Sequence, residues 1–249
     1  MEKKYWDGIS KNYEVEIFDV LKNDKRAIIG TYIRDIAASC NVIADVGCAV
    51  GKWLPLLADQ FSKVYAIDFS NACLKYAKAK YEKLSNIEFL NIDFTKPYKA
   101  QLKFEAVLCV NAVIIDSYSK RETFFKSLFN SLQDEGHLIL VVPSFESVLY
   151  REFIFDKCRR RDIVISKPKE VLNKKAYKHF KLGAVNIDKI PTKHFLREEL
   201  LMTLQSAGFR VDKIEKVEYS WETEIQNAPK WLTAPYPWDW IVIAQKNKK

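Results

Sequence analysis

The sequence predicts an α/β fold: a doubly wound, seven-stranded, mostly parallel sheet with a terminal antiparallel strand, helices on both faces and a basic insert after the fifth strand. Three observations carry this prediction. Short apolar runs alternate with helical patterns between residues 42 and 142, the order that right-handed βαβ units produce. The first of these runs ends on an acid, just before a glycine-containing turn. Two further strand patterns close the sequence without a helix between them.

The amino-terminal half of the sheet is expected before residue 92. Apolar residues near helical spacing predict helix over residues 9–39. The pattern then changes to strands separated by helices, and Ser70 is placed to cap the second of these helices. The elements expected in order are a strand at 42–46, a helix at 52–60, a strand at 64–67, a helix at 71–84 and a strand at 87–91.

The carboxyl-terminal half begins with a near-continuous apolar run, of the kind that a sheet covered on both faces needs. Pro143 stops the fifth strand, and Gly208 follows the last helix as a C-cap residue. Three prolines in residues 227–238 exclude regular structure from the connection between the last two strands. The elements expected in order are a strand at 104–110, a helix at 120–133, a strand at 136–142, a helix at 196–207 and strands at 209–221 and 239–245.

Composition and cysteine usage limit the classes of protein. With 249 residues, of which 48% are hydrophobic, the chain can bury a substantial core. No apolar run approaches the roughly 18 residues that span a bilayer, and the first residues lack the apolar centre of a signal peptide. The five cysteines form no C-x-x-C pair and no cluster with the three histidines. We therefore expect reduced thiols, no metal site, no membrane partner and a cytoplasmic protein.

The positive charge is concentrated in one segment. Residues 150–193 hold thirteen Lys and Arg against five Asp and Glu, a surplus of eight that equals the whole net charge of +8. The densest run is formed by Arg159, Arg160 and Arg161. A solvated surface and an anion-binding surface both fit this pattern, because charge patterning alone is weak evidence of binding.

The turn after the first strand is the most informative segment. It reads DVGCAVG over residues 45–51, and a helical pattern begins at Lys52. Glycine lets the backbone approach a ligand closely, and a helix start offers unpaired N–H donors. The spacing of Gly47 and Gly51 does not fit the G-x-G-x-x-G fingerprint of dinucleotide-binding proteins. A second acid, Asp68, ends the next strand, where a Rossmann-like unit places a carboxylate that accepts from ribose hydroxyls.

This turn resembles the first motif of class I S-adenosylmethionine (SAM)-dependent methyltransferases, commonly written D/E-x-G-x-G-x-G. Ala49 stands where the motif has its middle glycine. Alanine adds only a methyl group, so we expect it to be tolerated provided that the backbone at Ala49 does not need a positive φ. The resemblance covers about residues 5–143 and resumes at residue 195. It implies that the last two strands complete the sheet as an antiparallel pair.

The resemblance also implies the domain organisation, a single class I methyltransferase domain over residues 1–249. Its parts would be an N-terminal helical cap at 1–39, a SAM-binding core at 40–143, a basic lid insert at 144–194, and the final helix and strands at 195–249.

The cofactor implied by the resemblance is SAM, with S-adenosyl-L-homocysteine (SAH) as its product. Asp45 would lie near the SAM amino group, Asp68 would hold the ribose hydroxyls, and Asp93 would accept from the adenine amine. Three acids at consecutive strand ends are hard to attribute to helix capping alone. The other residues implied in cofactor binding are Tyr5, Trp6, Tyr13, Gly47, Cys48, Gly51, Phe69, Phe94 and Asn111.

Signals for the methyl acceptor are weaker. The fourth strand is not followed by the D/N/S-P-P-Y/F signature of nucleobase or glutamine amine methylation. Asp116, Tyr118 and His194 are candidate acceptor-facing or catalytic residues, although the first two also fit a loop that enters a helix. Because the SAM sulfonium is a strong electrophile, the protein mainly needs in-line alignment and exclusion of water, with or without a general base.

Three functions are compatible with these features. The favoured one is a methyltransferase acting on a small-molecule acceptor bound under the 144–194 insert. The second is an RNA methyltransferase, in which Arg159, Arg160, Arg161 and nearby lysines contact phosphates. The third is a catalytically inactive SAM-binding regulator, because the three acids bind cofactor without requiring turnover. The sequence specifies neither the methylated atom nor an oligomeric state.

Overall fold

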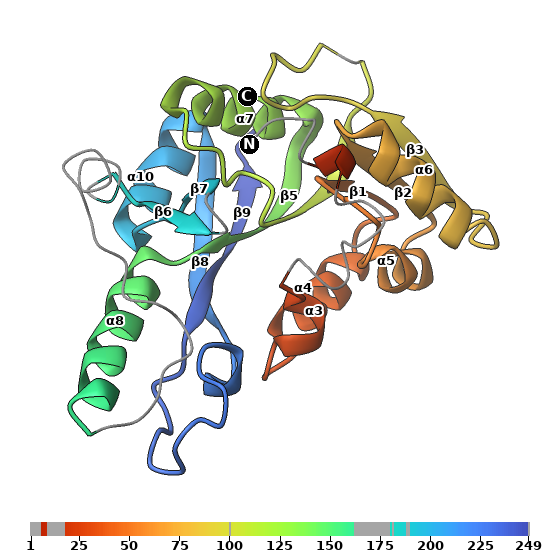
Figure 1. Ribbon diagram of the computed structural model, residues 1–249. Coiled ribbons are helices and arrows are strands. Elements are labelled where there is room, and N and C mark those ends of the chain that lie inside the picture. Colours follow the sequence, from red (N-terminus) through yellow and green to blue (C-terminus); the bar gives the residue numbers. More distant parts are fainter. Residues whose placement is uncertain are drawn as a thin grey trace.

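The computed structural model describes residues 6–8, 18–99, 101–161, 180, 182–187 and 190–248 (Figure 1). Its centre is a seven-stranded sheet with the order β3-β2-β1-β4-β5-β9-β8. Strands β1 to β5 run parallel, and β9 is antiparallel to both of its neighbours, β5 and β8. The strands are β1 Val42–Val46, β2 Lys63–Asp68, β3 Ile87–Asn91, β4 Phe104–Val110, β5 Leu132–Pro143, β8 Phe209–Glu218 and β9 Trp238–Lys246. The predicted fold class is confirmed.

Helices cover both faces of this sheet, and strand β4 shows why its sequence is apolar throughout. Its residues Val107 and Cys109 pack on one face with α7 (Tyr118–Ser131) and α10 (Arg197–Ala207). Its residues Ala106 and Leu108 pack on the other face with α4 (Ile28–Ala37), α5 (Leu54–Gln60) and α6 (Asn71–Lys80). A strand buried on both sides needs no polar alternation.

The amino-terminal helix differs from the prediction. Residues 9–17 lie outside the described residues, and the remainder of the expected 9–39 helix is two pieces, α3 (Val20–Asn23) and α4. The break has two local causes. The Asp24 carboxylate accepts from the backbone N–H groups of Arg26 and Ile29, at 3.1 and 3.0 Å. Ala27 then takes a left-handed conformation with φ of 49°. Because this conformation is not helical, it separates α3 from α4.

Other boundaries shift by a few residues. Helix α6 begins at Asn71, and Ser70 caps it by accepting from Cys73 N at 3.2 Å, as predicted. The helix stops at Lys80 rather than at residue 84, and β5 starts at Leu132 rather than at residue 136. Strand β8 ends at Glu218, and a short 3-10 helix, η1 (Trp221–Thr223), occupies the end of the expected 209–221 strand.

The insert contains structure that the sequence analysis did not predict. Helix α8 (Phe145–Arg159) is capped by Ser144, which accepts from Ser147 N at 3.0 Å. A two-stranded antiparallel hairpin follows, formed by β6 (Ala184–Ile187) and β7 (Ile190–Lys193). In Figure 1, α8 extends beyond the sheet beside the loop that links β8 to β9, and Phe155 of α8 packs with Trp221 of that loop. No helix within the described ranges is both long and apolar enough to cross a membrane.

Candidate functional site

A cavity of about 920 Å³ lies where the carboxyl ends of β1, β2, β3 and β4 meet. Ligands bind at this edge in open α/β sheets, because the strand-to-helix loops converge there. Carboxylates from three consecutive strands line the same cavity: Asp45, Asp68 and Asp93. The other sequence-predicted cofactor residues that line it are Trp6, Gly47, Cys48, Phe69, Phe94 and Asn111. Gly51 does not line the cavity, and Tyr5 and Tyr13 lie outside the described residues.

The turn between β1 and α5 is closely packed. Gly47 has a φ of +80°, and a Cβ added there would lie 2.3 Å from the Cβ of Ala112, in the loop after β4. Only glycine fits at this position. Ala49 also has a positive φ, 46°. The condition on which alanine was expected to be tolerated is therefore not met, and a non-glycine residue in this region costs about 1–2 kcal/mol. The turn keeps Ala49 despite that cost.

Four backbone N–H groups of this turn donate within the protein. Gly47 N and Cys48 N both donate to Ile67 O, at 2.8 and 3.1 Å, which ties the turn to strand β2. Ala49 N donates to a carboxylate oxygen of Asp68 at 3.0 Å, and Gly51 N donates to Cys48 O at 2.8 Å. These four N–H groups are bonded within the protein, and the turn forms a closely fitted wall of the cavity.

Asp45 is the most deeply buried acid of the three, with 2% of its surface exposed. Its Oδ2 atom is buried and has no hydrogen-bond partner among the described residues. Burial, followed by the charge of Asp68, raises the pKa of Asp45 to about 8. A buried acceptor without a donor costs about 1–3 kcal/mol, so this atom is suited to a ligand that brings an N–H or a positive charge.

Asp68 closes β2 and is fixed by backbone donors. Its Oδ2 accepts from Ala49 N at 3.0 Å, and its Oδ1 accepts from Ser70 N at 2.7 Å. Burial raises the pKa of the Asp68 carboxyl, while the hydrogen bonds from Ser70, Ala49 and the backbone of Phe69 oppose that rise. Each carboxylate oxygen has a second lone pair, so the group can still accept from a ligand in the cavity.

Asp93 and Phe94 form the wall beyond β3. One carboxylate oxygen of Asp93 accepts from Thr95 N and Thr95 Oγ1, at 2.9 and 2.6 Å. The other lies 3.7 Å from the ammonium of Lys96. Phe94 is buried, and its ring packs against Phe124 with centroids 5.7 Å apart. This wall combines an aromatic edge with a carboxylate that is 30% exposed.

Amino-terminal residues close another side. Trp6 lines the cavity, and its carbonyl accepts from Cys73 Sγ at 3.6 Å. Asp7 accepts from Ser70 Oγ at 2.5 Å, so residues 6–8 are attached to the start of α6. Farther along, Lys52 donates to Asp19 at 2.9 Å, which joins the segment before α3 to the β1 turn.

The side of the cavity toward the insert is apolar. It is formed by Ile114 and Ile115 from the loop after β4, and by Ile187 and Ile190 from the hairpin. Thr192 of β7 also lines it, and its hydroxyl is already bonded to Ile190 O at 3.2 Å. This part of the lining is largely apolar, and Lys120 of α7 also lines the cavity.

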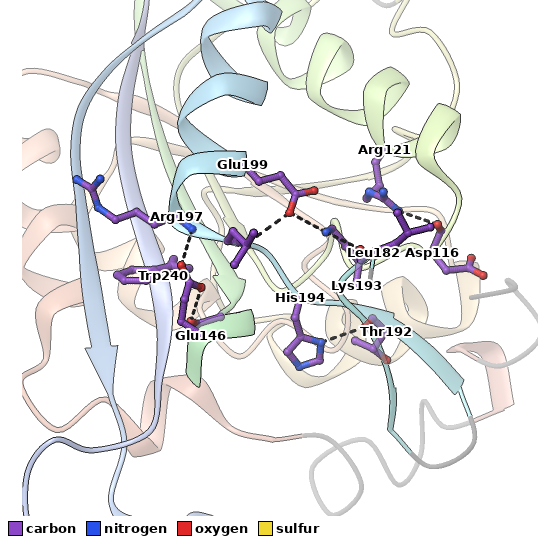
Figure 2. A network of polar contacts seen from close by, with 12 residues as sticks. Asp116, Arg121, Glu146, Leu182, Thr192, Lys193, His194, Arg197, Glu199 and Trp240 are labelled. Carbon is purple, nitrogen blue, oxygen red and sulfur yellow. Dashed lines mark hydrogen bonds and ion pairs between the residues drawn. The ribbon is translucent and has the colours of Figure 1, made fainter. Parts of the chain in front are cut away.

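Figure 2 shows how the hairpin is held in place. The buried Lys193 ammonium donates to Glu199 of α10 at 2.7 Å and to Leu182 O at 2.9 Å. Burial lowers the pKa of Lys193, and the bond to Glu199 opposes that change. Lys193 N also donates to Ile114 O at 2.9 Å, and Arg121 donates to the carbonyls of Ile115 and Asp116, both at 2.7 Å. One polar network therefore fixes both apolar walls.

The three weaker candidates lie away from the cavity lining. The Asp116 side chain is exposed, and Tyr118 is 68% exposed with its hydroxyl bonded to Glu122 at 3.2 Å. His194 is buried, with Nδ1 lying 3.0 Å from Thr192 O. Burial lowers the pKa of His194 to about 4, so its imidazole is neutral at pH 7. The three residues flank the loops that build the site without facing the cavity.

The basic run Arg159–Arg161 lies at the end of α8, also outside the cavity lining. Arg160 pairs with Asp156 at 2.8 Å. The guanidinium of Arg161 lies over the Trp231 ring, 4.9 Å from its centroid, and that of Arg159 lies 6.0 Å from the Phe155 centroid. All three side chains have partners within this part of the protein.

Sequence reasoning missed the hairpin and a polar chain behind Asn111. A signal for the hairpin exists, because two short segments with β-branched residues, 184–187 and 190–193, are separated by two residues. A second signal is Asp239, a single acid within the otherwise apolar run at residues 238–244. An acid in such a run is buried, and a buried acid needs partners.

The comparisons with known proteins fit this geometry. Residues 43–136 match a family model described as "Methyltransferase domain", and this range contains the three acids. No curated protein sequence matches the chain.

Several solved structures share the fold. A DhpI–SAM–HEP complex is 16% identical, with a TM-score of 0.62, 97% of this chain covered and 94% of that chain. Magnesium protoporphyrin IX methyltransferase (ChlM) from Synechocystis PCC 6803, with bound SAM, is 14% identical, with a TM-score of 0.60 and coverage of 98% and 95%. N-methyltransferase NodS from Bradyrhizobium japonicum WM9, in complex with SAH, is 12% identical, with a TM-score of 0.58 and coverage of 96% and 98%. The chain therefore shares the fold of class I, Rossmann-like SAM-dependent methyltransferases, and its residues 43–136 match the methyltransferase domain model.

Proposed function

We propose that the protein transfers a methyl group from SAM to a small-molecule acceptor that binds between the cofactor and the β6–β7 hairpin. The observation that carries this proposal is the single cavity that brings together Asp45, Asp68 and Asp93. The part of its lining that comes from the hairpin and the loop after β4 is largely apolar. One cavity thus has a polar end suited to a nucleoside with an amino acid side arm, and an apolar end suited to a second molecule.

The residues at the polar end fit SAM. The buried, unpartnered Asp45 Oδ2 suits the positively charged amino group, and Asp68 retains lone pairs for the two ribose hydroxyls. Asp93 and Phe94 suit the adenine amine and ring, and Phe69 also lines the cavity. Trp6 would cover the cofactor from the amino-terminal side. Structural neighbours determined with SAM or SAH support this cofactor.

The bound cofactor supplies an electrophilic methyl group, and the protein would contribute alignment and exclusion of water. The apolar walls at Ile114, Ile187 and Ile190 would hold the acceptor against that methyl group. Because the side chains of Asp116, Tyr118 and His194 lie outside the lining, the proposal assigns none of them the role of general base. A small-molecule acceptor agrees with the printed name of one structural neighbour, magnesium protoporphyrin IX methyltransferase (ChlM). A cytoplasmic location is part of the proposal, and the five unpaired cysteines support it.

The test is a transfer assay with methyl-labelled SAM and two separated fractions of a cell extract, one of metabolites and one of RNA. We expect label in one small product, and loss of that product in the Asp68→Ala variant. Label in RNA alone would contradict the small-molecule acceptor. Calorimetric binding of SAH without label in either fraction would favour the inactive regulator.

A further inference from the structure

A buried polar chain runs from the cavity lining at Asn111, just after β4, into the sheet. Asp239, on the antiparallel strand β9, is 9% exposed. Its Oδ2 accepts from the hydroxyl of Tyr219 at 2.7 Å and from the side-chain amide Nδ2 of Asn111 at 3.1 Å. Tyr219 is itself 4% exposed. Of the three residues, only Asn111 reaches the cavity. The chain therefore connects the interior of the sheet to one point on the ligand-facing wall.

This chain fixes the orientation of the Asn111 side-chain amide. An asparagine side chain has an NH2 group that donates and a carbonyl oxygen that accepts, whereas an ionised carboxylate only accepts. Asp239 therefore selects the NH2 end of Asn111 and leaves its Oδ1 on the opposite side. That Oδ1 atom is buried and has no hydrogen-bond partner within the described ranges.

The backbone of Asn111 is held as firmly as its side chain. Its φ of 50° lies in the left-handed region, and its N–H donates to Val141 O of β5 at 2.9 Å. A non-glycine residue persists in this region only where its surroundings determine it, and such residues cluster at ligand sites. Interactions with β5, with Asp239 of β9 and, through Asp239, with Tyr219 just after β8 thus hold Asn111 in one orientation.

Two residues that line this cavity, Asn111 and Asp45, each carry a buried acceptor without a donor among the described residues, Oδ1 and Oδ2 respectively. They come from neighbouring strands, because β1 pairs with β4 through Asp45 and Leu108. The loops that follow these strands also touch, since a Cβ on Gly47 would meet that of Ala112. A single group with several N–H donors and a positive charge satisfies both acceptors, and an ammonium is such a group.

We propose that Asp239 and Tyr219 are positioning residues that orient Asn111 so that its carbonyl oxygen accepts from the ammonium of the cofactor's amino acid end. This inference rests on the proposed function, because it assumes that SAM occupies the polar end of the cavity. It adds that two residues remote from the cavity determine how tightly the amino acid end is held, while the adenosine end is independent of them.

The test compares two ligands that differ at that end. SAH carries the ammonium, and 5′-methylthioadenosine keeps the adenosine and the sulfur but lacks the amino acid end. Calorimetry would measure both ligands with the wild-type protein, Asp239→Asn and Tyr219→Phe. An asparagine at position 239 can donate as well as accept, so Asn111 is no longer held in one orientation. We expect SAH affinity to fall roughly tenfold in Asp239→Asn and less in Tyr219→Phe, with methylthioadenosine affinity unchanged.

Tyr98→Phe is the matched control, because the Tyr98 hydroxyl is bonded to Leu102 O at 2.8 Å and Tyr98 does not line the cavity. It should bind both ligands as the wild type does. An equal loss for both ligands in Asp239→Asn would mean a general structural role, and no loss for either would mean no role; each result would overturn the inference. If the wild-type protein bound neither ligand, the proposed function itself would fail.

Discussion

The loops after β1, β2 and β3 and the β6–β7 hairpin line the same cavity, and they differ in how their polar groups are used. The strand loops bury Asp45 and Asp68, and leave one oxygen of Asp45 without a donor. The hairpin buries Lys193 and gives its ammonium two partners, Glu199 and Leu182 O. On the strand-loop side, the buried Asp45 Oδ2 has no donor among the described residues. On the hairpin side, the buried Lys193 ammonium has hydrogen-bond acceptors.

This difference teaches how the two ends select ligands. An unsatisfied buried acceptor favours a ligand with a donor at one position, so the strand loops select by hydrogen bonding and charge. A wall whose polar groups are already paired presents only apolar surface, so the hairpin selects by shape and burial. Variants in the strand loops should therefore change cofactor affinity, and variants around the hairpin should leave it unchanged.

The largest expected effect is at Gly47, where the strand loops approach most closely. In Gly47→Ala the new Cβ would meet Ala112 at 2.3 Å with a φ of +80°. Strain and overpacking together should destabilise the fold by about 2–4 kcal/mol and weaken SAH binding. Urea unfolding and calorimetry would measure the two effects.

Gly30→Ala is the matched control for Gly47→Ala. Gly30 lies within α4, and its nearest contact for a new Cβ is 3.5 Å. Alanine is a better helix former than glycine by about 1 kcal/mol, so this variant should be neutral or stabilised. Equal behaviour of the two variants would show that the β1 turn is not closely fitted.

Asp68 gives the next largest effect. Asp68→Ala removes acceptors for ribose hydroxyls and should weaken SAH binding by about 1–3 kcal/mol. Asp93→Ala should cost less, because it removes one hydrogen bond and leaves the aromatic packing of Phe94. Calorimetry would rank the two variants against Asp59→Ala, whose carboxylate is exposed on α5 and outside the cavity. If Asp68→Ala bound SAH as tightly as the wild type, Asp68 would not be the residue that holds the ribose hydroxyls.

On the hairpin side, Glu199→Gln should change stability without changing SAH affinity. The variant keeps the shape of Glu199 and removes the charge that faces the buried Lys193 ammonium, 3% exposed. Because Glu199 is 32% exposed, solvent screening limits the expected loss to about 1–2 kcal/mol. Urea unfolding measures the loss, and hydrogen exchange should quicken at hairpin amides. A fall in SAH affinity would show that the two ends of the cavity are not independent.

The smallest effect is a proton released on binding. Burial raises the pKa of Asp45 to about 8, so the free protein holds this proton at pH 7. The unfolded chain loses it near pH 4, so this group's contribution to stability falls as pH rises from about 4 to 8. A bound ammonium favours the ionised carboxylate, and SAH binding at pH 7 should therefore release close to one proton.

Calorimetry in two buffers with different ionisation enthalpies measures that proton, and SAH affinity should increase between pH 6 and 8. Asp45→Asn should abolish the release. Release that persists in Asp45→Asn would assign the proton to another group, such as Asp68, whose charge acts on Asp45.

The sequence predicted the features that depend on local patterns. Apolar runs fixed the positions of β1 to β5, and the acids that end β1 and β2 predicted the edge at which the cavity lies. The family model over residues 43–136 covers this same part. In this part of the chain the end of each strand can be predicted from its own sequence. The acids that meet at the cavity can therefore be identified one strand at a time.

The features that the sequence did not predict depend on contacts between residues far apart in the chain, or on backbone conformations that packing imposes. The bond from Asn111 to Asp239 joins positions 128 apart, and neither residue's neighbours reveal it. Strands β6 and β7 have four residues each, too few for a clear alternation. The break at Ala27 depends on a left-handed backbone that alanine rarely adopts. These features arise from packing, which overrides local preference.

The most direct measurement is a crystal structure of the protein with SAH. The account predicts SAH in the cavity, its ribose hydroxyls against Asp68, its amino acid end toward Asp45 and Asn111, and the space beside Ile187 and Ile190 left for an acceptor. SAH bound elsewhere, or bound in the cavity with its ribose facing the hairpin, would contradict the account.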